Sequence, residues 1–295
     1  MAEAHLRWSN SEWQRGDIEA SIVRADKAVQ GFRGLARGDF SSHALRLAHS
    51  LIVRGNRLAL LGRTREAIAS IREAIEVERR LLEIRDPSGS EGRLVERLSV
   101  LGALLAEAGE TEGSVEISKE AVERGRQVFA RDPEAYVETL AELLDLYGLR
   151  LYWGHRFTDA AERARESIEL IRRLIRRSGE EDLRAWLRAW LCQQLRNYAI
   201  YLVEAGLSSD ALSVAEEAVA LAEDLTPKNV HRDRLRARTL HVLAERLMES
   251  GRGDEAVTAA HQAITLYQDL SSKHAEFSSA TEITELKDIV SRGTI

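Results

Sequence analysis

The residues whose types and spacing come closest to a reactive pair are His241 and Glu245, four positions apart. On a helix this spacing places both side chains on one face, where an imidazole and a carboxylate can share a metal ion or pass a proton. Glu142 and Asp145 form a similar pair, three positions apart. Charged residues make up 31% of the chain, however, and such pairs are common on solvated helix faces. We therefore predict no catalytic residues, no metal site and no cofactor.

Other reactive signatures are absent from the sequence. The lone cysteine, Cys192, lies in a segment rich in tryptophan and is interpreted as a buried, inert thiol. The sequence contains no Walker A or GxGxxG pattern for binding phosphates and no GxSxG motif for a serine nucleophile. A single cysteine also excludes an internal disulfide framework.

Composition favours a soluble helical protein. The formal net charge is −6, which argues against a general nucleic-acid binder. The first residues lack the apolar core of a signal peptide, and no apolar run reaches the roughly 18 residues that a membrane span needs. We therefore predict a cytoplasmic location, with neither nucleic acid nor a membrane as partner. With only 3 prolines and 19 glycines, the chain has too few turn residues for an all-β fold.

A short turn recurs along the chain between two apolar helical runs. The central residues of the turns are Gly62, Gly109, His155, Gly206 and Gly251, with a weaker copy at Gly16, and they are 45 to 51 residues apart. Leucine stands four residues before each of the five stronger turns, and small residues stand seven before and five after. Large apolar residues at helical spacing form a buried face, and small residues let two helix backbones approach closely. The repeat therefore predicts six helical hairpins.

This pattern resembles the tetratricopeptide repeat (TPR), in which a large and a small residue precede the turn and alanines follow it. The matching pairs are Leu101-Gly102, Tyr147-Gly148, Tyr198-Ala199 and Leu243-Ala244. The period of about 46 residues exceeds the usual 34, as in the long-period arrays of the kinesin-light-chain and bacterial regulatory types. The first copy departs from the pattern, because Glu12 stands where leucine is expected.

The resemblance implies an all-α, right-handed TPR-like solenoid of about six hairpins. We place the array within residues 1–270 and the hairpins at about 1–35, 42–85, 91–131, 133–177, 181–225 and 230–270. Residues 271–295, which include Phe277 and Leu286, are predicted to form a helix that caps the last hairpin. The three prolines fall between hairpins, at Pro87, Pro133 and Pro227.

The resemblance also implies a binding groove lined by the first helix of each hairpin. Projected onto that face, the candidate ligand residues are Asn10, Trp13, Asn56, Glu96, Glu142, Asp145, Tyr152, Trp153, Arg196, Arg238, His241 and Glu245. The thirty projected positions hold eight acidic residues and two arginines, which predicts a basic partner. Tyr152 and Trp153 are candidates for stacking on the ligand. Chaperone-binding TPR domains clamp a carboxylate with basic residues, but Leu6, Glu96 and Ser99 stand nearby here, so we predict no such clamp.

These observations favour a non-catalytic scaffold that holds a peptide or protein segment in its groove. One alternative is a regulatory sensor domain that changes curvature when it binds a signal peptide or small molecule. A second is an unusual enzyme or pathway accessory that uses Glu142, Asp145, His241 and Glu245 in a groove pocket. A homodimer formed through a terminal hairpin is a further expectation.

The small residues before the turns provide a test of the repeat register. We expect Gly102→Leu or Gly148→Leu to lower the free energy of unfolding by about 1–3 kcal/mol, because the added side chain overpacks the hairpin. Thermal unfolding of both variants measures the effect, and unchanged melting temperatures in both would mean that the register is wrong.

Overall fold

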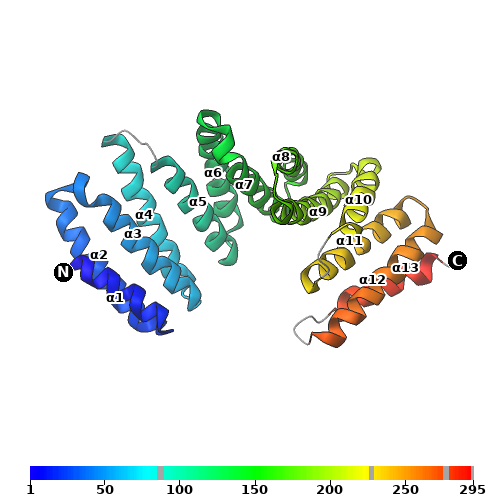
Figure 1. Ribbon diagram of the computed structural model, residues 1–295, viewed down its shortest axis with the longest axis horizontal. Coiled ribbons are helices and arrows are strands. Elements are labelled where there is room, and N and C mark those ends of the chain that lie inside the picture. The colour runs from blue at the N-terminus through cyan, green and yellow to red at the C-terminus, as the bar shows by residue number, and fades with distance from the viewer. Residues whose placement is uncertain (85–89, 226–228, 275–278, 294–295) are drawn as a thin grey trace. The chain divides into compact units, whose positions relative to one another are not determined.

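The computed structural model describes residues 1–84, 90–225, 229–274 and 279–293. Within these ranges the chain forms thirteen α-helices and no strand (Figure 1). The helices are α1 (Ala2–Gln14), α2 (Ile18–Gly38), α3 (Phe40–Leu60), α4 (Thr64–Ile84), α5 (Ser90–Glu107), α6 (Thr111–Arg131), α7 (Pro133–Trp153), α8 (Phe157–Arg177), α9 (Glu181–Glu204), α10 (Ser208–Glu223), α11 (Val230–Glu249), α12 (Gly253–Lys273) and α13 (Ala280–Gly293). Pro133 begins α7, whereas Pro87, Pro227 and Phe277 lie outside the described residues.

The chain divides into two compact units, residues 1–136 and 137–295. In the first unit each helix from α1 to α6 packs on the next one along the chain. In the second unit the same is true from α8 to α13, and α11 also packs on α9. Within that unit a side-chain hydrogen bond from Trp190 of α9 reaches Asp145 of α7 (3.4 Å). First helices of successive hairpins therefore lie side by side in the second unit.

Each hairpin closes through the same backbone turn. The central residue has a positive φ angle in all six, at Gly16, Gly62, Gly109, His155, Gly206 and Gly251. The amide of the following residue donates to the carbonyl five positions back, as Arg63 does to Leu58 (2.9 Å). This is the left-handed helix end that glycine favours. Asp17 makes the equivalent bond to the carbonyl of Glu12 (3.0 Å), so the first hairpin shares the turn although it lacks the leucine.

The two helices of a hairpin cross where both carry a small residue. In the first hairpin the hydroxyls of Ser9 and Ser21 each donate to the other residue's carbonyl oxygen (2.8 Å in both cases). In the third, the Ser114 hydroxyl donates to the carbonyl oxygen of Gly102 (2.7 Å). A Cβ atom added at Gly148 would lie 3.4 Å from the carbonyl oxygen of Ala160. The small residues therefore permit the close approach that the sequence predicts.

Ion pairs join the second helices of neighbouring hairpins. In the first unit the Arg33 guanidinium donates to Glu73 at 2.7 Å, and Arg79 donates to Glu120 at 2.6 Å. In the second unit Arg252 bridges Glu216 and Glu255. Each pair is partly exposed and contributes about 0–1 kcal/mol. These pairs place Arg33, Arg79 and Arg252 on the side of their hairpins that carries the second helix.

The C-terminal helix α13 covers the last hairpin. Leu286 and Ile289 of α13 are buried in one apolar cluster with Leu240 and Leu247 of α11 and Tyr267 of α12. This arrangement agrees with the capping helix that the apolar spacing predicts. Across the described ranges, none of the helices combines the length and the apolar character that crossing a membrane requires.

His155 is the one described residue other than glycine with a positive φ angle (56°). We expect His155→Gly to raise the free energy of unfolding by about 0.5–1 kcal/mol, because glycine adopts this conformation without the steric cost of a Cβ atom. Urea denaturation of the whole chain measures the change.

The matched control is Gly206→His, which places the same side chain in the equivalent turn and is expected to cost about 1–2 kcal/mol. Equal or lower stability of His155→Gly would show that the edge-to-face contact between His155 and Phe157 (5.6 Å between ring centres) outweighs the backbone strain.

Candidate functional site

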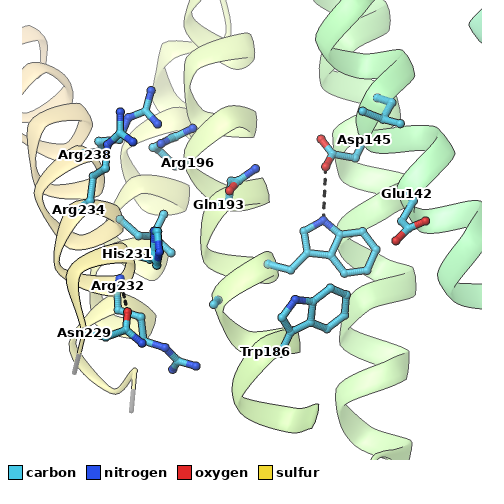
Figure 2. A pocket seen from close by; sticks show the side chains of 14 residues that line it. Glu142, Asp145, Trp186, Gln193, Arg196, Asn229, His231, Arg232, Arg234 and Arg238 are labelled. Atoms are coloured by element: carbon cyan, nitrogen blue, oxygen red, sulfur yellow. Dashed lines mark hydrogen bonds between the residues drawn. The ribbon is translucent and has the colours of Figure 1, made fainter. Parts of the chain in front are cut away.

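The first helices of three successive hairpins line a groove in the second unit (Figure 2). Its volume is about 760 Å³, and it is open to solvent. The lining side chains are Glu142, Asp145 and Leu146 of α7, Trp186, Ala189, Trp190, Gln193 and Arg196 of α9, and Asn229, His231, Arg232, Arg234, Leu235 and Arg238 at the start of α11. We call this the α7–α9–α11 groove. Its volume lies in the range of ligand-binding sites, about 300–1,000 Å³.

Two tryptophans supply the aromatic surface of the groove. The rings of Trp186 and Trp190 lie one helical turn apart on α9, with their centres 5.4 Å apart. The Trp190 indole N–H donates to a carboxylate oxygen of Asp145 (3.4 Å), which fixes its ring against α7. Trp186 has no such tether and is 45% exposed. It therefore offers a large, partly solvated ring for a ligand to cover.

The α7 wall is acidic. Glu142 is exposed and Asp145 is half-buried, one helical turn apart. Burial raises the pKa of Asp145 above its ordinary value. The pKa of Glu142 is raised by burial and by the neighbouring carboxylates of Glu138 and Asp145. The charges of Arg150 and Arg196 partly oppose the pKa shift of Asp145, whereas the charges acting on Glu142 are those of neighbouring carboxylates.

The opposite wall is basic. Figure 2 shows Arg196 of α9 beside Arg234 and Arg238 of α11, on the side of the groove away from Glu142 and Asp145. One Nη of Arg196 donates to the side-chain oxygen of Asn197 (2.8 Å), but its Nε is buried without a hydrogen-bond partner. Burial, together with the adjacent charge of Arg238, lowers the pKa of Arg196 to about 10. The guanidinium of Arg196 is therefore desolvated without a direct ion pair among the described residues, although its charge lowers the pKa of Asp145.

The start of α11 is held by a side-chain cap. The Asn229 side-chain oxygen accepts a hydrogen bond from the backbone N–H of Arg232 (3.1 Å), which satisfies a free donor at the helix start. This cap fixes the first turn of α11, and with it His231 and Arg232, at the rim of the groove.

Four of the residues predicted from the sequence meet in this groove: Glu142, Asp145, Arg196 and Arg238. Tyr152 and Trp153 lie nearer the turn of the same hairpin and do not line it. The Tyr152 ring stacks on Tyr201 of α9 with centres 5.0 Å apart, which is a packing contact, whereas Trp153 is 53% exposed.

His241 and Glu245 occupy a different place, under the C-terminal helix. His241 is buried, and its Nε2 lies 3.8 Å from a Glu245 oxygen and 3.7 Å from a Glu285 oxygen of α13. Glu245 lines a separate hollow of about 410 Å³ between α11 and α13. Burial raises the pKa of Glu245. Among the described residues, no group of three or more histidine, cysteine or acidic side chains is arranged to hold a metal ion.

The remaining predicted residues belong to the first unit. Asn10 and Trp13 lie on α1, Asn56 on α3 and Glu96 on α5, all at least partly exposed. The Arg57 guanidinium lies over the Trp13 ring, 4.0 Å from its centre, which is a cation–π contact. Their role in ligand binding stays a prediction.

Sequence reasoning missed the part of the groove that lies far from the turns. The positions projected from the sequence reach back only thirteen residues from each turn. The lining residues that lie further back include Trp186, His231, Arg232 and Arg234. Continuing the helical spacing by one or two turns toward the start of each helix would have reached Trp186 and Arg234. The groove therefore extends further from the turns than the face that was projected from the sequence.

Comparison with known proteins supports the repeat architecture. The tetratricopeptide repeat family model matches residues 236–274, which fall in the last hairpin. No curated protein is similar enough in sequence to count as a relative of the chain. The similarity to known proteins is therefore strongest at the level of the fold.

Several solved structures share that fold at low sequence identity. BtubC from P. vanneervenii is 19% identical, with a TM-score of 0.61 and coverage of 86% of this chain and 92% of its own. A candidate kinesin light chain of Podosopora anserina with nearly identical TPR-like repeats is 16% identical, with a TM-score of 0.58 and coverage of 79% and 98%. The apo form of RapI is 9% identical, with a TM-score of 0.59 and 99% coverage of both chains. The predicted all-α, TPR-like fold is confirmed.

The uncompensated guanidinium in the groove has a consequence for stability. We expect Arg196→Met to raise the free energy of unfolding by about 1 kcal/mol, because an apolar side chain of similar length removes a desolvated charge that has no anionic partner. Urea denaturation measures this change.

Arg165→Met on α8 is the matched control, because Arg165 is exposed and only loosely paired with Glu169 (3.8 Å). We expect that substitution to change stability by less than about 0.5 kcal/mol. A clear loss of stability in Arg196→Met alone would contradict the description of Arg196 as uncompensated.

Proposed function

We propose that this tetratricopeptide-repeat protein is a non-catalytic scaffold that holds a segment of a partner protein in the α7–α9–α11 groove. The observation that carries the proposal is the convergence of aromatic, acidic and basic side chains from three first helices on one open groove. Solenoid proteins commonly bind partners along such a surface, because each repeat contributes side chains to it.

The form of the groove favours a peptide segment as the ligand. The groove is open to solvent, so an extended chain can enter along it and leave at either end. Trp186 presents an exposed ring, and aromatic residues supply much of the affinity at protein interfaces. Gln193 and Asn229 add polar groups that can bond a peptide backbone.

Three further expectations from the sequence accompany this proposal. The cytoplasmic location, the homodimer through a terminal hairpin and the absence of a nucleic-acid partner stay predictions. The predicted basic partner requires revision for this groove, because its lining carries four arginines and two carboxylates.

Selection from a phage-displayed library of random twelve-residue peptides tests the proposal. We expect the whole protein to enrich a set of related sequences, and synthetic peptides of those sequences to bind in a fluorescence-anisotropy titration. Trp186→Ala is expected to weaken their binding by about tenfold or more, because it removes the exposed aromatic surface of the groove.

The matched control is Trp8→Ala. Trp8 is 47% exposed, close to the value for Trp186, but it lies on α1 in the first unit. We expect its removal to leave peptide affinity unchanged. Failure to enrich any sequence, or equal losses in the two variants, would overturn the proposal that this groove holds the partner.

A further inference from the structure

Three charged residues of the groove, Glu142, Arg196 and Arg238, form no ion pair among the residues that the structure describes. Elsewhere in the described chain, arginines commonly reach a carboxylate, as Arg33 reaches Glu73 and Arg252 reaches two glutamates. Within the described ranges, no oppositely charged side chain lies within ion-pair distance of Glu142 or Arg238, and Arg196 donates only to the neutral side chain of Asn197. The groove therefore contains charges of both signs, on Glu142, Arg196 and Arg238, that no ion pair neutralises in the described part of the chain.

The α7 carboxylates and the groove arginines form no ion pair within the described residues, although the charge of Arg196 lowers the pKa of Asp145. In Figure 2 Gln193 and Trp186, both of α9, stand between the acidic residues of α7 and the arginines of α11. The Trp190 indole satisfies one oxygen of Asp145 from the α9 side, but it carries no charge. The separation of charge is thus built into the order of the three helices.

Each wall also crowds charges of one sign. Glu142 stands between the carboxylates of Glu138 and Asp145, which raise its pKa together with burial. Arg196 stands beside Arg238, and its buried Nε points to no acceptor. A cationic ligand group at the acidic α7 wall and an anionic group at the basic wall would relieve this crowding. The anionic group would also accept a hydrogen bond from the unpaired Nε–H of Arg196.

Building on the proposed function, we propose that the partner segment carries charges of both signs in a fixed order. An aspartate or glutamate side chain binds Arg196 and Arg238, an apolar or aromatic residue covers Trp186, and a lysine or arginine binds Glu142 and Asp145. The order of the helices sets the order of these side chains across the groove, with the anion at Arg196 and α11, the apolar residue at the α9 tryptophans and the cation at α7.

A ligand of one sign fits the groove less well. A purely basic segment, as predicted from the sequence, is attracted to Glu142 but meets the guanidinium groups of Arg196 and Arg238. A purely acidic segment is attracted to Arg196 and Arg238 but is repelled by the carboxylates of α7. Like charges brought together in a partly desolvated site repel strongly, so the mixed segment is favoured over both.

The peptides enriched in the library selection provide the first test. We expect them to share an acidic residue, an apolar residue and a basic residue in a constant order. Synthetic copies with an acetylated amino terminus and an amidated carboxyl terminus should bind equally well, because the charges come from side chains. Enriched peptides without this order, or peptides that lose binding when their terminal carboxylate is blocked, would overturn the inference while leaving the proposed function intact.

Charge reversal on both partners provides the second test. Arg238→Glu should weaken the enriched peptide by about tenfold or more, and replacing the peptide's acidic residue by lysine should restore the loss. Glu142→Arg should likewise weaken binding of the enriched peptide, and replacing the peptide's basic residue by glutamate should restore that loss. Each reversed peptide should restore binding only to the protein variant reversed at the wall that its changed residue contacts. That outcome assigns each peptide charge to its wall.

Controls separate this effect from a change in overall charge. Arg165→Glu on α8 and Glu223→Arg on α10 change the net charge by the same amounts at exposed positions outside the groove. We expect each to alter affinity by less than about twofold at 150 mM salt, where distant charges are screened. Losses in the controls equal to those in the groove variants, or losses that the reversed peptides do not restore, would overturn the inference. If no peptide is enriched at all, the proposed function fails instead.

Discussion

The fold depends on the close approach of two helix backbones within each hairpin. That approach requires a small residue on both helices where they cross, as at Ser9 with Ser21 or Gly148 with Ala160. Once the backbones are close, the leucines on either side of the crossing can interdigitate without voids. The inner face of each first helix is used for this packing, and its opposite face remains available for a ligand.

The groove follows from repeating that arrangement. In the second unit α11 packs on α9, and Trp190 of α9 reaches Asp145 of α7, so three available faces lie in a row. Helix α9, with 24 residues, is the longest that the structure describes, and Trp186 and Trp190 lie in its first half. The groove therefore gains its aromatic surface from the middle helix, its acidic wall from α7, and its basic wall from α11 together with Arg196 of α9.

Much of this could be predicted from the sequence, because the turn and the crossing positions recur six times and each recurrence constrains the register. That regularity placed Glu142, Asp145, Arg196 and Arg238 on one face. The position of His241 could not be predicted in this way. Its helical register puts it on the same face, but α13 covers it, and the docking of a single terminal helix leaves no periodic signal. The arginines at the start of α11 were missed because they lie more than thirteen residues before the turn, beyond the projected positions.

The helix α13 also constrains how such an array can evolve. Its Leu286 and Ile289 occupy apolar surface of α11 and α12 that a further hairpin would need in order to stack. If a duplicated repeat is inserted before α13, the same helix can cover the apolar face of the new last hairpin. A repeat added after α13 finds that surface already taken. Growth of the array by duplication is therefore favoured inside the chain, upstream of its cap.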